Sequence, residues 1–191
     1  MNIHDKKFAL LGNNLAIDFI NTQVIQNGEL VDMLGVPADI NHWAQQVGYT
    51  LTSDVTINDL ATVKILREGL KTLVLAAIEG TNPSKDELVI LNYYLEEHRT
   101  HQQLEINPET GELRLAVNNN KAHLSSLLAN VAYEGAQLLA SSQVSYVKSC
   151  SNPECVLLFL DTSRTKRRRW CSMDTCGNRA KVARHYRKET Q

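Results

Sequence analysis

Four cysteines near the C-terminus have the residue type and spacing that bind a metal ion. They are Cys150, Cys155, Cys171 and Cys176, with four residues inside each pair and fifteen between the pairs. Zinc prefers tetrahedral sulfur ligation, and four thiolates leave no position open for water or substrate. We therefore predict one structural Zn²⁺ held by all four thiolates.

Two other uses of these thiols remain open. Two disulfides would also use four cysteines, but disulfides are rare in the cytoplasm. We expect a cytoplasmic protein, because the sequence shows neither a signal peptide nor an apolar run long enough to span a membrane. Release of zinc on thiol oxidation would make the protein a redox sensor. The spacing favours structural zinc over both.

Positive charge surrounds the cysteines. Residues 148–191 contain 11 Lys+Arg and 4 Asp+Glu, which gives a net charge of +7. Residues 1–147 contain 9 Lys+Arg and 17 Asp+Glu, which gives a net charge of −8. A basic cluster beside a zinc module is typical of nucleic-acid binding. We predict that this chain binds duplex DNA. The predicted contacts are Arg164, Lys166, Arg167, Arg168 and Arg169 between the cysteine pairs, and Asn178, Arg179, Lys181 and Arg184 after them.

The basic residues also have other interpretations. Some cations would offset the charge of −2 on a zinc ion with four thiolates, and Arg179 could hydrogen-bond a carbonyl inside the finger. A finger can also dock a partner protein as an adaptor. An enzyme is not expected, because the chain lacks a P-loop, G-x-G-x-x-G, G-x-S-x-G and H-E-x-x-H.

The segments around the cysteines must bring both pairs to one ion. Residues 156–160 have the composition of a strand, 161–163 of a turn and 167–170 of a returning strand, so we predict a hairpin between the pairs. Residues 178–188 are compatible with a helix. The result is a zinc-ribbon or treble-clef-like module over 143–191. Because it has little apolar core, we expect a chelator to unfold it while the rest survives.

The remaining chain, 1–142, has the periodicity of a helical domain. Apolar residues recur at helical spacing, and one alternating apolar segment on each side of the turn at 107–111 predicts a β-hairpin over 104–117. Ser84 and Glu87 fit a capping box. The predicted fold class is mainly α with a small β-hairpin (α+β). The expected helices cover about 13–20, 36–47, 58–79, 84–95 and 121–140.

Three polar residues stand in a mostly apolar N-terminal segment. Asp18, Asn21 and Thr22 could line a pocket for a small-molecule effector. The alternative, which we favour, is that Asn21 and Thr22 satisfy backbone groups where a helix ends and that Asp18 pairs with a nearby base.

The chain resembles a known pair of domains. The tetrapeptide Cys176-Gly177-Asn178-Arg179 and its flanks resemble the CGNR zinc finger, and the N-terminal part looks like the ABATE domain usually joined to it. The resemblance implies a stress-induced transcription regulator. We expect its N-terminal domain to sense a ligand or to mediate homodimerisation. The similar segments are 158–164, 168–173 and 176–182 for the finger, and 15–22, 32–34, 37–39 and 66–68 for the N-terminal domain.

Overall fold

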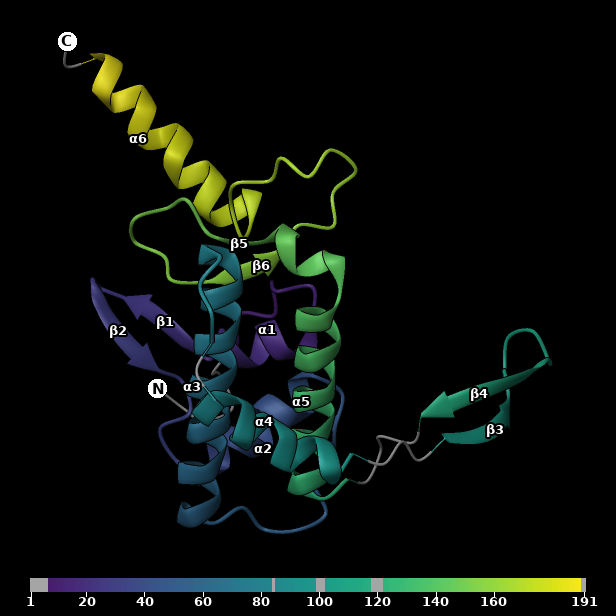
Figure 1. Cartoon of the computed structure of the whole chain (residues 1–191). Coiled ribbons are helices and arrows are strands. Elements are labelled where there is room, and N and C mark those ends of the chain that lie inside the picture. Colours follow the sequence, from purple (N-terminus) through teal and green to yellow (C-terminus); the bar gives the residue numbers. More distant parts are fainter. Residues whose placement is uncertain (1–6, 84, 99–101, 118–121, 190–191) are drawn as a thin grey trace.

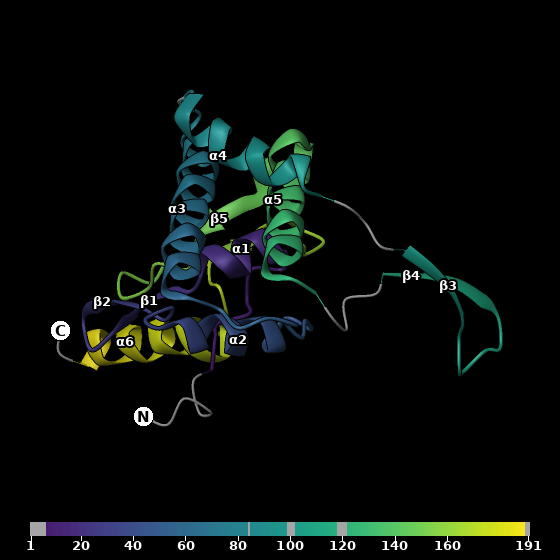
Figure 2. The ribbon, with the colours of Figure 1, turned by 90° about the horizontal axis from the view of Figure 1, so that it is seen from below.

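Helices form the body of the protein. The computed structural model describes residues 7–83, 85–98, 102–117 and 122–189. Two long helices, α3 and α5, pack on each other, and α4 and α1 pack against both (Figures 1 and 2). The predicted N-terminal helices are confirmed as α1 (Leu15–Ile20), α2 (Pro37–Gln46), α3 (Ile57–Glu79), α4 (Lys85–Glu96) and α5 (Leu124–Ala140). Within the described ranges, no helix is long and apolar enough to cross a membrane.

Side-chain caps and a glycine set the ends of these helices. Asn14 accepts hydrogen bonds from the first backbone amides of α1. Thr56 and Asp59 form a capping box at the start of α3, and Gly80 ends that helix with a positive φ of 69°. The box predicted for α4 involves Ser84, which lies outside the described residues.

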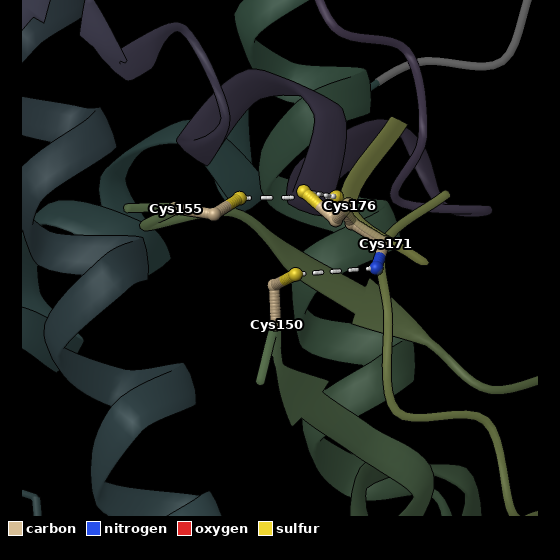
Figure 3. Close-up of side chains that lie close together, drawn as sticks. All are labelled: Cys150, Cys155, Cys171 and Cys176. Atoms are coloured by element: carbon tan, nitrogen blue, oxygen red, sulfur yellow. Dashed lines mark hydrogen bonds between the residues drawn. The ribbon is translucent and has the colours of Figure 1, made fainter. Parts of the chain in front are cut away.

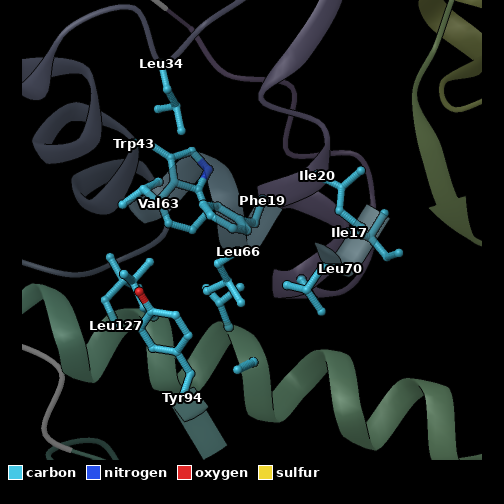
Figure 4. Packing of buried hydrophobic residues seen from close by; sticks show 14 of the residues in the cluster. Ile17, Phe19, Ile20, Leu34, Trp43, Val63, Leu66, Leu70, Tyr94 and Leu127 are labelled. Atoms are coloured by element: carbon cyan, nitrogen blue, oxygen red, sulfur yellow. The ribbon is translucent and has the colours of Figure 1, made fainter. Parts of the chain in front are cut away.

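A large apolar core joins the helices. Its largest fully buried members include Phe19, Trp43 and Leu66, drawn in Figure 4. Phe19 and Trp43 pack with ring centroids 5.2 Å apart. The core also contains Val147, Leu158 and Leu160 from the C-terminal part of the chain. The predicted finger therefore contributes strands to the core of the helical domain.

In the part of the chain that the structure describes, three antiparallel strand pairs accompany the helices. The predicted hairpin is confirmed as β3 and β4, which stand apart from the helices in both views. A second hairpin, β1–β2, turns at Asn27 and Gly28, whose φ values are 52° and 85°. Asn-Gly is a strong hairpin signal that our prediction missed. The pairs are β1 (Gln23–Gln26) with β2 (Glu29–Asp32), β3 (Gln102–Ile106) with β4 (Leu113–Val117), and β5 (Val147–Ser149) with β6 (Leu158–Leu160).

The hairpin that we predicted between the cysteine pairs is wrong, because its first strand pairs with a different segment. β6 pairs with β5, which precedes the first cysteine, and not with residues 167–170. The opposite edge of β6 is taken by the N-terminal domain. Leu160 N–H donates to the Gly12 carbonyl (2.8 Å), and Leu158 exchanges two hydrogen bonds of 2.9 Å with the Asn21 side chain. Since both edges are occupied, a strand at 167–170 has no place to pair.

A buried arginine ties α3 to β2. The Arg67 side chain is 1% exposed and donates to both carboxylate oxygens of Asp32, at 2.7 and 2.8 Å, and to the Thr22 hydroxyl at 2.9 Å. Burial alone would raise the pKa of Asp32, but hydrogen bonds from Arg67, the Leu34 backbone N–H and Lys64, together with the charge of Arg67, outweigh it and lower the pKa to about 2. The ion pair is therefore intact at neutral pH.

Acid should weaken this ion pair within a defined range. The pKa of Asp32 is lower in the folded state than its usual 3.8, so its contribution is complete above about pH 4 and disappears as the pH falls towards 2. We expect the loss to be about 1–2 kcal/mol, because solvent screens this partly exposed carboxylate. Urea unfolding of wild type and Asp32→Asn between pH 5 and 2 tests it: the stability difference between them should shrink with acid. A constant difference would contradict the assignment.

Candidate metal centre

The four predicted ligands come together in space. Cys150 directly follows β5, Cys155 lies before β6, and Cys171 and Cys176 stand at the start of the last helix, α6 (Asn178–Glu189) (Figure 3). Their Sγ atoms all lie within 4.8 Å of one another. The first pair thus occupies the loop of the β5–β6 hairpin and the second the approach to α6, a treble-clef-like order.

The sulfur geometry fits zinc. A tetrahedral ion about 2.3 Å from each sulfur requires sulfurs about 3.8 Å apart. The Sγ atom of Cys171 lies 3.8 Å from that of Cys155 and 3.6 Å from that of Cys176. Bound zinc would cross-link the hairpin loop to the start of α6, and its four thiolates would leave no position open for chemistry.

Amide groups around the cluster stabilise negative sulfur. The Cys171 backbone N–H points at Cys150 Sγ (3.5 Å), and the side-chain amide of Asn152 donates to Cys176 Sγ (3.4 Å). Asn152 is 8% exposed, so this amide is held inside the site. Such contacts orient metal ligands and spread the thiolate charge.

The cysteines cannot all ionise without a cation. Hydrogen bonding from Cys171 lowers the pKa of Cys155 to about 5, whereas the same contact raises the pKa of Cys171 far above its usual range. Burial raises the pKa of Cys150. One thiolate forms readily and opposes the others, so four thiolates at neutral pH need a bound metal ion.

A buried carboxylate organises the loop between the cysteine pairs. Asp161 is 0% exposed and accepts hydrogen bonds from Lys148 Nζ (2.7 Å), the Ser163 hydroxyl (2.6 Å) and the Arg168 backbone N–H (2.9 Å). Burial opposes its charge, but these donors hold its pKa well below the usual range. Lys148 also donates to the carbonyl of Lys166. Asp161 lies in a segment that resembles the CGNR finger, but its bond to Lys148 was not predicted, because no spacing rule connects the two residues.

Two predicted nucleic-acid contacts are engaged inside the finger. Arg168 donates to the carbonyls of Trp170 and Cys171, and its guanidinium lies 4.6 Å from the centre of the Phe159 ring. Lys166 Nζ donates to the Asp161 carbonyl at 2.8 Å. The role of Lys166 and Arg168 as nucleic-acid contacts stays a prediction, and we base the proposal below on other residues. Arg168 takes the structural role that we had considered for Arg179.

The other predicted contacts with described side chains are exposed. Arg169 lies over the Trp170 ring, 5.4 Å from its centre, and the Asn178 amide donates to the Asp174 carbonyl. Arg164, Arg167, Arg179 and Lys181 make no hydrogen bond or ion pair with any residue that the structure describes. Arg184 belongs to α6, and its side chain lies outside the described part of the chain. Free cations thus flank the metal centre on the loop and on α6.

A glycine allows the finger to close. A Cβ atom on Gly177 would lie 2.8 Å from Met173 Sδ and 3.3 Å from Trp170 Cδ1, closer than ordinary van der Waals contact. A larger residue at position 177 would therefore require the Met173 side chain to move and Trp170 to shift slightly.

The three residues considered for an effector pocket have partners within the protein. Asn21 is bound to Leu158, and the Thr22 hydroxyl donates to the Phe19 carbonyl and accepts from Arg67. Asp18 accepts from the Gly12 backbone N–H at 2.7 Å rather than from a base, and burial raises its pKa to about 6. Asn21 positions the finger against α1, and the role of the three residues in a pocket stays a prediction.

Comparison with known families places the chain. Residues 146–189 match the CGNR zinc finger. Residues 13–142, more than half of the chain, match ABATE, described as "Putative stress-induced transcription regulator". The protein belongs to the ABATE family. No curated protein sequence matches this ABATE protein.

The two family matches correspond to two parts of the structure. The helical body with β1–β2 and β3–β4 lies in the ABATE match, and the β5–β6 hairpin, the four cysteines and α6 lie in the CGNR match. The ABATE protein is thus a zinc-finger protein of a regulator family, with its cysteine cluster inside the finger.

Proposed function

We propose that this ABATE protein is a zinc-dependent transcription regulator whose finger binds duplex DNA. The observation that carries the proposal is the set of cations without internal partners beside the metal centre: Arg164, Arg167, Arg179 and Lys181. A structural zinc ion would hold the loop and the start of α6 in one orientation. The proposed DNA contacts would then be preorganised, which reduces the entropy cost of binding.

Helix α6 has a shape that suits the major groove. It packs on the turn before it and extends away from the body (Figure 1). Its 12 residues span about 18 Å, and the major groove, about 12 Å wide, admits one helix. Arg179 stands in the first turn, where recognition helices place residues that contact base edges. The Arg164–Arg167 loop would bind phosphates.

The acidic N-terminal domain would supply the regulation. With a net charge of −8 over residues 1–147, it is repelled by DNA and leaves binding to the finger. We assign it effector sensing or homodimerisation. A dimer would place two fingers on two half-sites and compensate for the small surface of one finger.

A protein adaptor is the second candidate. Apolar side chains are exposed on the finger, including Met173 at 50% and Val182 at 54%. Such residues would suit a partner protein. If the finger is an adaptor, substitutions that change its charge should leave nucleic-acid retention unaltered but abolish binding of a partner protein.

Removing two loop arginines tests the DNA proposal. We expect Arg164→Ala plus Arg167→Ala to weaken binding to random duplex DNA at least tenfold at low salt. The slope of log K against log salt should become shallower by about 0.9 for each phosphate that the variant no longer neutralises. Fluorescence anisotropy of labelled DNA with the zinc-loaded protein, titrated over salt, measures both quantities.

The matched control removes the same charge elsewhere. Lys7 and Lys85 are exposed in the N-terminal part, so Lys7→Ala plus Lys85→Ala should change the slope little. Equal effects of the two double variants would show that net charge alone matters. An unchanged slope in the arginine variant would overturn the phosphate contacts.

A further inference from the structure

The β3–β4 hairpin has an exposed apolar face. Leu104, Ile106 and Leu113 are between 64% and 68% exposed. Ile106 pairs with Leu113, and Leu104 stands two residues before Ile106, so all three lie on one face of the two-stranded sheet. Polar residues, among them Glu105 and Arg114, alternate with them in the sequence. We call Leu104, Ile106 and Leu113 the hairpin face.

Such a hairpin needs a partner. An isolated two-stranded hairpin is at best marginally stable in water, and its free edges and apolar side chains favour association with another chain. Among the elements that the structure describes, no helix packs on β3 or β4, and the hairpin points away from α3 and α4 (Figures 1 and 2). The hairpin face is therefore available to a second molecule.

A second apolar surface lies on α3 and α4. Ile65, Val89 and Tyr93 are between 58% and 68% exposed. Val89 and Tyr93 stand one turn apart on α4. Ile65 lies one turn from Thr62 on α3, and Thr62 and Tyr93 line the same small cavity. Ile65, Val89 and Tyr93 thus form one strip across both helices, which we call the helix strip.

The hairpin face and the helix strip match in spacing and size. Leu104 and Ile106 lie about 6.8 Å apart along β3, and Val89 and Tyr93 lie about 6 Å apart along α4, so one row of side chains can pack on the other. At roughly 100 Å² for each side chain that is two-thirds exposed, the two surfaces together offer roughly 600 Å² per chain.

One chain therefore carries both halves of an interface. A second copy supplies the partner, and two-fold symmetry makes the same contact twice. The two contacts would bury about 1,200 Å² in total, which is the size of a small stable interface.

We propose that two copies of the protein exchange their β3–β4 hairpins, each placing its hairpin face on the helix strip of the other. The hairpin follows α4 in the chain, so a two-fold axis beside α4 brings each hairpin to the helix strip of the second copy. The finger, at the far end of α5 from the hairpin, stays uncovered (Figure 1). That this dimer sets two fingers on two half-sites of DNA rests on the proposed function.

Complementary charges test the contact. Ile106→Lys and Val89→Glu should each weaken the dimer at least tenfold, because each puts a charge against apolar side chains. A mixture of the two variants should form a dimer with one copy of each, since one of its contacts is unaltered and the other pairs the introduced charges. Sedimentation equilibrium of the full-length, zinc-loaded protein without DNA measures the mass, and the wild type should have twice the mass of one chain.

Leu30→Lys is the matched control, because Leu30 is exposed on β2 and lies outside both surfaces. It should leave the dimer intact, and all three variants should keep the helical circular dichroism of the wild type. A monomeric wild type would overturn the exchange and leave a different protein as the occupant of the hairpin face. A dimeric Val89→Glu variant, or variants that dissociate and do not recover on mixing, would refute the contact between hairpin and helices. A dimer that does not bind DNA would contradict only the proposed function.

Discussion

Removing zinc should unfold the helical ABATE domain together with the finger. Structural zinc contributes about 10–16 kcal/mol in finger peptides, which is as large as the about 5–15 kcal/mol that stabilises a whole domain. From the sequence we expected the finger to unfold alone. The structure changes this expectation, because Leu158 and Leu160 of β6 belong to the main core and Asn21 depends on β6 for its hydrogen bonds. Loss of the finger would expose this core.

The two tryptophans allow a direct measurement. Trp43 is buried in the helical core and Trp170 lies in the finger. In the variant Trp170→Phe, all tryptophan fluorescence therefore comes from Trp43. Strong chelation should shift Trp43 emission to the red and reduce the helical circular dichroism. Cys171→Ser should behave the same way without chelator. A Trp43 signal and helix content that survive chelation would show that the two parts fold independently.

Asp161→Asn should destabilise the protein by about 3–5 kcal/mol, the usual cost of breaking a buried ion pair. An amide keeps the shape of Asp161 but removes its charge and turns a donor either towards both Lys148 and the Arg168 N–H or towards Ser163. The loop between the cysteine pairs would then lack the group that closes it. Zinc affinity should fall as a consequence, since Arg168 connects this loop to the Cys171 carbonyl.

Urea unfolding of the zinc-loaded protein measures the loss. The pKa of Asp161 is far below its usual value, so the full effect should be present at pH 7 and disappear only in strong acid. Asp174→Asn is the control, because Asp174 is exposed in the same finger; it should change stability by less than about 0.5 kcal/mol. Equal losses in the two variants would refute the role of Asp161.

The features predicted from sequence were those set by short-range patterns. Cysteine spacing gave the metal site, and helical periodicity with caps gave the helices, including the Gly80 stop of α3. The Asn27-Gly28 turn followed a known rule and was missed. The hydrogen bonds of Asn21 to the edge of β6 could not be predicted, because Asn21 lies 137 residues from Leu158.

The direction of long side chains was equally beyond prediction. Arg167 and Arg168 are adjacent and chemically identical, yet Arg167 is exposed while Arg168 bonds two carbonyls of the finger. The difference depends on Asp161, which accepts a hydrogen bond from the Arg168 backbone N–H and so fixes the backbone path of the loop. Only the folded loop separates a structural arginine from one free to bind a ligand.

The bond between Asn21 and Leu158 also bears on how a cell makes this protein. A ribosome adding about 5–20 residues per second would complete residue 158 about 7–27 seconds after residue 21, given the separation of 137 residues. During this interval the nascent α1 segment has no β6 to cover it. Chaperones that bind apolar segments would thus meet Ile17, Phe19 and Ile20, which the finished protein buries. Final closure of the core would follow release of the finger from the exit tunnel and its capture of zinc.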